Sequence, residues 1–147
     1  MRPEEAQPAQ MIFELPGTYA AIGDVVERII GAVLACSRAG RCHRLNEGVI
    51  DELRIAWTEA LNNSIEHGYS GREGAPLRLA LWCRDARVAL TIADLGQALP
   101  PGLLEGGGCE PHLGEGGRGW HLIHATTDRV AYARRDGWNL LILEKAL

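Results

Sequence analysis

The sequence predicts a single α+β domain, a two-layer sandwich in which helices pack on a sheet. Two helical patterns lie in the first half of the chain, and two pairs of strand patterns, each joined by a short turn, follow them. Runs of helices and antiparallel hairpins, without alternating βα units, are typical of this class. A chain of 147 residues is long enough for one such domain. We expect residues 1–9, rich in proline, glutamate and glutamine, to be a flexible tail, and residues 10–147 to form the domain.

The first expected elements are a short strand and a long helix. Residues 11–15 predict an edge strand, which Pro16 and Gly17 end. Residues 19–39 carry apolar side chains at helical spacing, and Gly40 ends this helix.

A second helix is expected to begin after Asn46, a residue type that often caps helix N-termini, and to stop at Gly68. Residues four apart lie on one helix face, so polar residues at this spacing gather beside the apolar stripe. The residues predicted on the core side are Leu53, Trp57, Ala60 and Ser64. Those predicted on the flank of the stripe are Glu59, Asn63 and His67, and Asn62 and Glu66 are predicted to face solvent.

The rest of the chain predicts two hairpins separated by a long loop and a short helix. Apolar and polar residues alternate in each predicted strand, and a loop of this length in a compact domain is usually functional or disordered. The expected elements are strands over 76–84 and 87–93 around Asp85-Ala86, a glycine-rich loop over 95–119, a helix over 120–127, and strands over 129–134 and 138–145 around Asp136-Gly137.

Composition and charge narrow the function. The formal net charge of −4 argues against a nucleic-acid partner bound through its phosphates, because such domains are usually basic. No apolar run approaches the roughly 20 residues that a membrane helix needs. The N-terminus lacks the basic start and apolar core of a signal peptide. We therefore expect a cytoplasmic protein with no direct nucleic-acid or membrane partner.

Lysine is represented by Lys145 alone, against fourteen arginines. A P-loop needs a lysine after its glycines, and a eukaryotic-type protein kinase needs one on its third strand. Lys145 stands in the last predicted strand and fits neither plan, so a nucleotide site in this chain must follow another design.

The four cysteines, Cys36, Cys42, Cys83 and Cys109, include no CxxC pair, and thiols are the expected state in a reducing cytosol. Cys42-His43 and Cys109-x-x-His112 could contribute to a zinc site. We favour thiols, because this spacing fits no structural zinc pattern well.

Three segments carry residues suited to phosphate chemistry. Glu59 and Asn63, one turn apart, can hold a proton acceptor beside a divalent ion, as phosphoryl transfer with magnesium requires. Asp94 follows a strand and precedes Gly96, so it can accept a hydrogen bond from an exocyclic amine while the glycine lets a base approach. The glycine-rich run 114–119 opens a helix, whose N-terminal N–H groups attract anions.

Each segment also has a simpler interpretation. Glu59 and Asn63 could be surface residues, although adjacent asparagines in mid-helix have poor helix propensity. His67 fits a group that closes the helix better than a catalytic one. Asp94-x-Gly96 occurs in ordinary turns, and the glycine run could be a linker.

Taken together and in this order, the three segments resemble the motifs of the GHKL (Bergerat-fold) ATP-binding superfamily. The matching residues are Glu59, Asn63, His67 and Gly68 for the N-box, Asp94 and Gly96 for the first glycine box, and Gly117, Arg118, Gly119 and Trp120 for the second. The chain is most similar to the bacterial anti-sigma-factor serine kinases, in its small size, its helix near the N-terminus and its final Gly-Trp hairpin. The resemblance covers about residues 10–147.

This resemblance implies a mixed, mostly antiparallel sheet with helices on one face, and it implies ATP or ADP and Mg²⁺ as cofactors. Glu59 would activate the hydroxyl of a serine on a partner protein. Asn63 would hold Mg²⁺ on the ATP phosphates, and Asp94 would read the adenine amine. Residues 95–118 would form a lid over the nucleotide. The other implied nucleotide contacts are His67, Gly96, Ala98, Gly117, Arg118, Gly119 and Trp120.

The implied partners are an anti-sigma-factor antagonist of the STAS type, which carries the target serine, and a sigma factor that is sequestered; a homodimer is also implied. Ala98 departs from the family, which often has a glycine there, and Cys109 and His112 are unusual in a lid. These departures favour one alternative, a nucleotide-binding partner-switching module without kinase activity. A histidine kinase catalytic part is a weaker alternative, because no phosphoacceptor helical hairpin is recognisable.

Overall fold

The computed structural model describes residues 11–40, 45–84, 86–100, 102–103 and 114–147. The predicted tail and the Asp85 turn residue lie outside this part of the chain. In chain order the elements are β1 (Met11–Pro16), α1 (Tyr19–Arg38), α2 (Glu47–Asn63), the π-helical turn η1 (Ser64–Gly68), β2 (Pro76–Arg84), β3 (Arg87–Asp94), α3 (Gly114–Thr126), β4 (Arg129–Arg135) and β5 (Trp138–Ala146).

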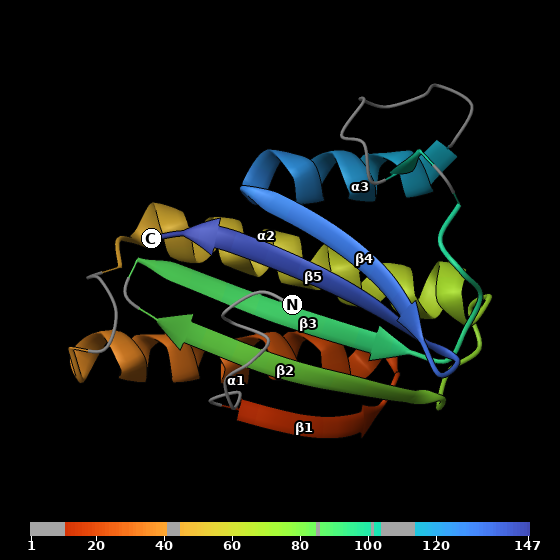
Figure 1. Cartoon of the computed structure of the whole chain (residues 1–147), viewed down its shortest axis with the longest axis horizontal. Helices are drawn as coiled ribbons and strands as arrows, with labels where there is room; N and C mark the ends of the chain where they lie inside the picture. Colours follow the sequence, from red (N-terminus) through yellow and green to blue (C-terminus); the bar gives the residue numbers. More distant parts are fainter. Residues whose placement is uncertain (1–10, 41–44, 85, 101, 104–113) are drawn as a thin grey trace.

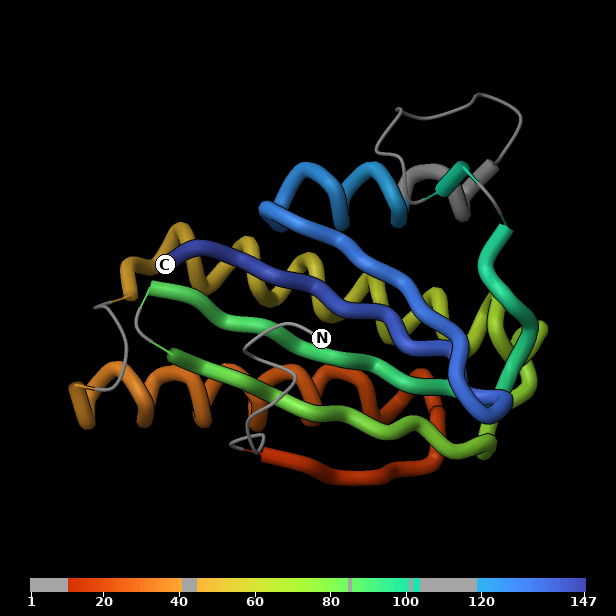
Figure 2. The backbone as a smooth tube through the Cα atoms, viewed as in Figure 1, coloured from red at the N-terminus to blue at the C-terminus, as the bar shows by residue number. Residues whose placement is uncertain are grey.

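The predicted α+β sandwich is confirmed. Five strands form one sheet in the order β1-β2-β3-β5-β4, and α1 and α2 lie behind one face of it (Figure 1). Figure 2 shows that α3 lies beside the β4 edge of the sheet, next to α2. Every strand pairing is antiparallel, so the expectation of a mixed sheet was wrong. Two of the pairs, β2 with β3 and β4 with β5, are hairpins, which are antiparallel by construction. Between β1 and β2 the chain passes through α1 and α2, and between β3 and β5 it passes through α3 and β4.

The core lies between the sheet and the helices. Alternate residues of β2 and β3 turn toward the helices, and the apolar stripes of α1 and α2 meet them. On α2 the predicted core residues Leu53, Trp57 and Ala60 are fully buried, and Ser64 is buried just beyond the end of the helix. Among the helices of the described residues, none combines the length and apolar character that a bilayer crossing requires.

The start of α2 is as the sequence predicts. The Asn46 side chain accepts a hydrogen bond from the Val49 backbone N–H at 2.8 Å and so satisfies one of the free donors of the first turn. The end of α2 differs, because the helix passes at Ser64 into a π-helical turn, in which the Tyr69 N–H bonds the Ser64 carbonyl. Single π turns of this kind are common near functional sites.

The last hairpin closes through Asp136 and Gly137, which have φ values of 52° and 82°. Both are in the left-handed region, as the tight turn predicted for this dipeptide requires. The hairpin places Asn139 of β5 directly opposite Asp94 of β3. Lys145, near the end of β5, is buried and donates to Glu52 of α2 at 2.6 Å, so it helps to hold the helix layer on the sheet.

The main error of the sequence prediction concerns α3. The glycine-rich run was expected to be a loop ending at Gly119, but the helix already begins at Gly114. Glycine is a weak helix former, and a pattern based on propensity assigns it to a loop. Packing overrides that preference here, because Gly119 and Trp120 are both buried against the rest of the domain.

Replacing Asn46 tests the start of α2. We expect Asn46→Ala to lower the free energy of unfolding by about 1 kcal/mol, because the Val49 N–H loses its acceptor. Asn46→Asp keeps a side-chain oxygen in place and should leave the stability nearly unchanged. Urea denaturation followed by circular dichroism measures both values. Equal losses in the two variants would show that the cap contributes nothing.

Candidate functional site

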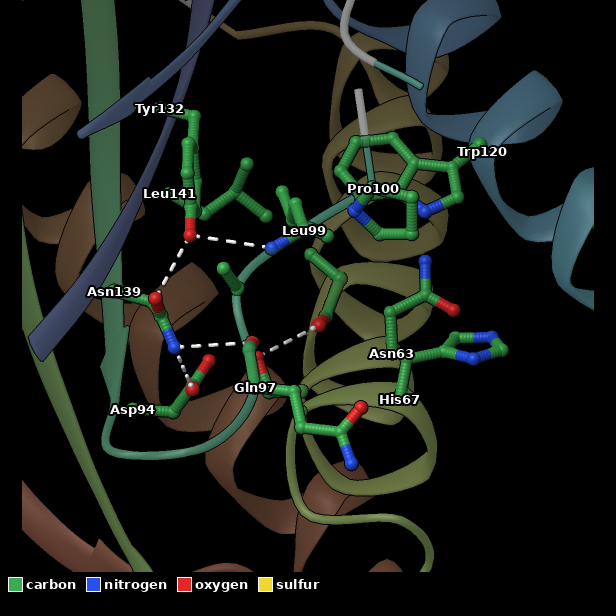
Figure 3. A pocket seen from close by; sticks show the side chains of 14 residues that line it. Asn63, His67, Asp94, Gln97, Leu99, Pro100, Trp120, Tyr132, Asn139 and Leu141 are labelled. Atoms are coloured by element: carbon green, nitrogen blue, oxygen red, sulfur yellow. Dashed lines mark hydrogen bonds between the residues drawn. The ribbon is translucent and has the colours of Figure 1, made fainter. Parts of the chain in front are cut away.

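A cavity of about 140 Å³ lies where the C-terminal end of α2, residues 97–100 and Trp120 of α3 meet. Its lining includes Asn63, His67, Asp94, Trp120 and Asn139, which come from five separate elements (Figure 3). The segments singled out in the sequence therefore converge on one hollow.

Asn63 is the last residue of α2 and is only 6% exposed. Its Nδ2 atom is buried and has no hydrogen-bond partner among the described residues. The sequence placed Asn63 on the flank of the apolar stripe together with His67. In the structure Asn63 is buried while His67 is exposed, because the π turn rotates the residues that follow Asn63. Both still line the cavity.

Glu59 and Asn63 face the same residue of α3. A Cβ atom built on Gly119 would lie 3.1 Å from Glu59 Oε2 and 3.3 Å from Asn63 Oδ1. Any larger residue at position 119 would push into these two side chains. A glycine here therefore lets α3 pack against the functional end of α2, and this explains why the second glycine segment stands where it does.

Trp120, next to Gly119, is 3% exposed, and its Nε1 is a second buried donor without a partner among the described residues. An unsatisfied buried donor costs roughly 1–3 kcal/mol, so two of them at one cavity call for explanation. Oxygen atoms of a bound anion are the acceptors that would satisfy both. The cavity thus fits a ligand that carries phosphate groups.

Asp94 lies at the end of β3 and is 8% exposed. Its Oδ1 accepts hydrogen bonds from the Gly96 N–H at 2.9 Å and from Asn139 Nδ2 at 2.8 Å. Burial raises the pKa of the Asp94 carboxyl above its usual value, and these hydrogen bonds oppose the rise. Because the pKa is raised on folding, the ionised carboxylate costs stability as the pH rises above the usual range of an aspartate. Such a cost is typical of a functional carboxylate.

Asn139 is the site residue that sequence reasoning missed. It is 3% exposed and touches Asp94 and the backbone that follows it. Along the sequence it is one polar residue within a strand, forty-five positions from Asp94. The available signal was its position on the inward-facing side of β5, where the alternation calls for an apolar residue.

The segment after β3 lies directly on the end of η1. The Gln97 N–H donates to the Gly68 carbonyl at 2.7 Å. A Cβ atom on Gly96 would overlap the Gly68 carbonyl group, and a Cβ atom on Gly68 would lie 3.2 Å from Asp94 Oδ1. The backbone contact therefore requires glycine at position 96, and Gly68 leaves room for the Asp94 carboxylate.

The Tyr69 side chain stabilises the same region through two hydrogen bonds. Its hydroxyl accepts from the Leu95 N–H at 2.7 Å and donates to the Pro76 carbonyl at 2.6 Å. It therefore ties the segment after β3 to the start of β2. Ala98, the residue that departs from the family pattern, is exposed and also lines the cavity.

Some expected site residues cannot be placed fully. Gly117 and Arg118 lie in the first part of α3, and Cys109, His112, Cys42 and His43 lie outside the described residues. Within the part of the chain that the structure describes, no group of three or more His, Cys, Asp or Glu residues is arranged to hold a metal ion.

Known proteins resemble this chain in sequence. The family described as histidine kinase-like ATPase domain matches residues 25–145. Serine/threonine-protein kinase BtrW of Bordetella bronchiseptica is 36% identical over 98 residues, which are 62% of this chain and 66% of that protein. Serine-protein kinase RsbW of Oceanobacillus iheyensis is 30% identical over 95 residues, which are 60% of each chain. The matches therefore span less than two thirds of the length of either relative.

A solved structure has the same fold. The RsbU and RsbW domains of a Mycobacterium tuberculosis protein superpose with a TM-score of 0.53, over 92% of this chain and 32% of that chain. At 14% identity this likeness concerns the fold alone.

The glycine contact gives a direct test. Gly96→Ala should lower the free energy of unfolding by about 1–3 kcal/mol, because its methyl group has no space beside the Gly68 carbonyl. The matched control is Gly23→Ala on α1, where nothing lies within 4 Å of the added Cβ. It should raise the stability by roughly 0.5–1 kcal/mol through helix propensity. Thermal unfolding measures both, and a harmless Gly96→Ala would contradict the packing described.

Proposed function

The chain belongs to the family of histidine kinase-like ATPase domains, and on this premise we propose that it is an ATP-dependent protein serine kinase that works by partner switching. Its relatives in Bordetella bronchiseptica and Oceanobacillus iheyensis are both named as serine kinases, which supports the proposal. In the proposed pathway this protein phosphorylates an anti-sigma-factor antagonist and sequesters a sigma factor.

One observation carries the kinase proposal. The carboxylate of Glu59 and the amide of Asn63 both lie against Gly119, and the buried Asn63 donor has no partner among the residues that the structure describes. A carboxylate beside a phosphate-binding amide is the pairing that phosphoryl transfer to a hydroxyl needs. Asp94 lies at the other end of the same cavity, where a base would be recognised.

The residues fit the proposed nucleotide and ion. Asn63 would contribute its amide oxygen to Mg²⁺, and Trp120 Nε1 would donate to a phosphate oxygen. The adenine amine would donate to Asp94, beside Gly96 and Ala98. His67, Gly117, Arg118 and Gly119 complete the proposed nucleotide contacts. ATP supplies the phosphoryl group, and Mg²⁺ neutralises the charge that develops on the phosphates.

Glu59 is the proposed general base. It accepts the proton of the serine hydroxyl while the serine oxygen forms a bond to the γ-phosphorus and the bond to ADP breaks. Glu59 is half-buried and lies outside the lining of the cavity itself, so an incoming hydroxyl can approach it from the protein surface. This position suits a substrate that belongs to another protein.

The proposed partners are a STAS-type antagonist protein that carries the target serine, a sigma factor and a second copy of this chain. The sheet face away from the helices offers room for a protein contact. Ile12 of β1 lies on that face and is 72% exposed.

The second candidate function is a nucleotide-binding partner switch without kinase activity. Ala98 favours it, because alanine restricts the backbone beside the cavity more than glycine does. The two functions share nucleotide binding and differ only in phosphate transfer.

Nucleotide binding is tested first with Asn63→Ala. We expect Mg²⁺-dependent binding of ATP to the wild type in titration calorimetry, and an at least tenfold weaker affinity in the variant, since one hydrogen bond to a charged group contributes roughly 1.5–3 kcal/mol. Asn62→Ala, half-buried on the neighbouring position of α2, is the matched control. Absence of binding to the wild type would refute both candidate functions.

Phosphate transfer is tested with Glu59→Gln. Transfer of labelled phosphate from ATP to a STAS-type antagonist of the same organism should fall by about 10²–10⁴-fold, the usual contribution of a general base. ATP binding should persist, because Glu59 does not line the cavity. Unchanged transfer in the variant would exclude Glu59 as the base. Binding of ATP by a wild type that transfers no phosphate would favour the second candidate function.

A further inference from the structure

We propose that Asn139 is the positioning residue that sets the nucleobase preference of this site, by holding Asp94 so that its remaining acceptor capacity meets an exocyclic amine. The inference rests on the proposed function, since it requires that a purine nucleotide binds beside Asp94. Asn139 is not part of any of the three motifs recognised in the sequence.

The donor end of the Asn139 side chain makes three contacts. Its Nδ2 lies 2.8 Å from Asp94 Oδ1, 2.9 Å from the Gly96 carbonyl oxygen and 3.2 Å from the Gln97 carbonyl oxygen. One amide group therefore joins β5 to the carboxylate and to the two residues that run past the cavity. Figure 3 shows the bonds from Asn139 to Asp94 and to Gln97 on the sheet side of the site.

The acceptor end fixes the direction of the amide. Asn139 Oδ1 accepts from the Tyr132 hydroxyl at 2.7 Å, and that hydroxyl accepts from the Leu99 N–H at 3.2 Å. The opposite orientation of the amide would point its oxygen at a carboxylate and two carbonyls. The surroundings thus leave a single arrangement, in which Asn139 donates to Asp94.

The consequence for Asp94 concerns its two oxygens. The hydrogen bonds from Asn139 and from the Gly96 N–H both go to Oδ1. Each carboxylate oxygen has two acceptor sites, so Oδ2 keeps most of the acceptor capacity of the group. Ser64 of η1 lines the same cavity, and its hydroxyl donates to the Ala60 carbonyl oxygen at 3.3 Å. A held, ionised acceptor favours a ligand that donates, such as a 6-amino purine, over a 6-oxo purine, which presents an acceptor in the same place.

Loss of the Asn139 amide would remove this preference in a specific way. Asp94 would lose one of its charge-assisted donors and could turn or take up a proton. A protonated carboxyl can donate to a 6-oxo group. The ratio of the two affinities would therefore fall, because the amino purine would bind more weakly and the oxo purine would show no equal loss.

The experiment compares, by titration calorimetry, the affinities of ADP and IDP, which differ in the 6-amino or 6-oxo group of the base and in the N1 proton that the oxo form carries. The wild type should prefer ADP by roughly 10- to 100-fold, the equivalent of one unsatisfied buried group. In Asn139→Leu, a change of similar size, this ratio should fall to nearly one. Because Asn139→Leu leaves several buried groups unpaired and could fail to fold, Tyr132→Phe is the second variant. It removes only the hydroxyl that orients the amide and should lower the ratio in the same direction.

The control is Asn46→Ala, which loses an asparagine at the far end of α2 and should lower the stability without changing the ratio of affinities. A purely structural role for Asn139 would weaken ADP and IDP equally and leave the ratio at the wild-type value, and this result would overturn the inference while leaving the proposed function intact. An unchanged ratio in Tyr132→Phe, with Asn139→Leu unfolded, would also overturn it. A wild type that binds neither nucleotide would refute the proposed function itself.

Discussion

The contact between the backbones of Gly68 and Gly96 is the constraint on which the site depends. It brings the end of the helical layer against the end of β3, and the space between them admits no side chain. The Gln97 N–H and the Gly68 carbonyl seal it with a hydrogen bond. Residues 97–100, which follow this contact directly, line the cavity together with Asp94 and Asn63. Glycine is required here for close approach, since no positive φ angle is involved at either residue.

Around this contact the protein keeps polar groups where packing alone would favour apolar ones. Asn63 and Trp120 each bury a donor that finds no partner in the described part of the chain, and Asp94 buries a carboxyl whose pKa is raised. The core offsets this loss of stability, because the apolar stripes of α1 and α2 and the buried faces of β2 and β3 pack into one continuous cluster. Local instability at one end of a well-packed domain is the pattern expected of a binding site, and the proposed nucleotide would supply the missing partners.

Asn139 and Glu59 show how two layers contribute different parts of one site. Glu59 and Asn63 come from the helical layer and border Gly119, whereas Asp94 and Asn139 come from neighbouring strands of the sheet. The sheet end is held by many hydrogen bonds within the protein, and the helix end has unpaired donors. A rigid end for recognition and an open end for chemistry suit a ligand with a base at one end and phosphates at the other.

The sequence by itself determined the α+β class, the strand pairs, the cap at Asn46 and the motif residues Glu59, Asn63, Asp94 and Gly96, because periodicity, capping and turn chemistry act over a few residues. It mistook the start of α3 for a loop, since glycine propensity was outweighed by the packing of Gly119 and Trp120. It also missed the π turn that follows the buried Asn63 and in which His67 is exposed. Only the tertiary structure decided that Asn139 belongs to the candidate site and that the backbone of Gly68 contacts Gly96. These are contacts between residues far apart in the chain, and such contacts leave no local pattern from which they could be predicted.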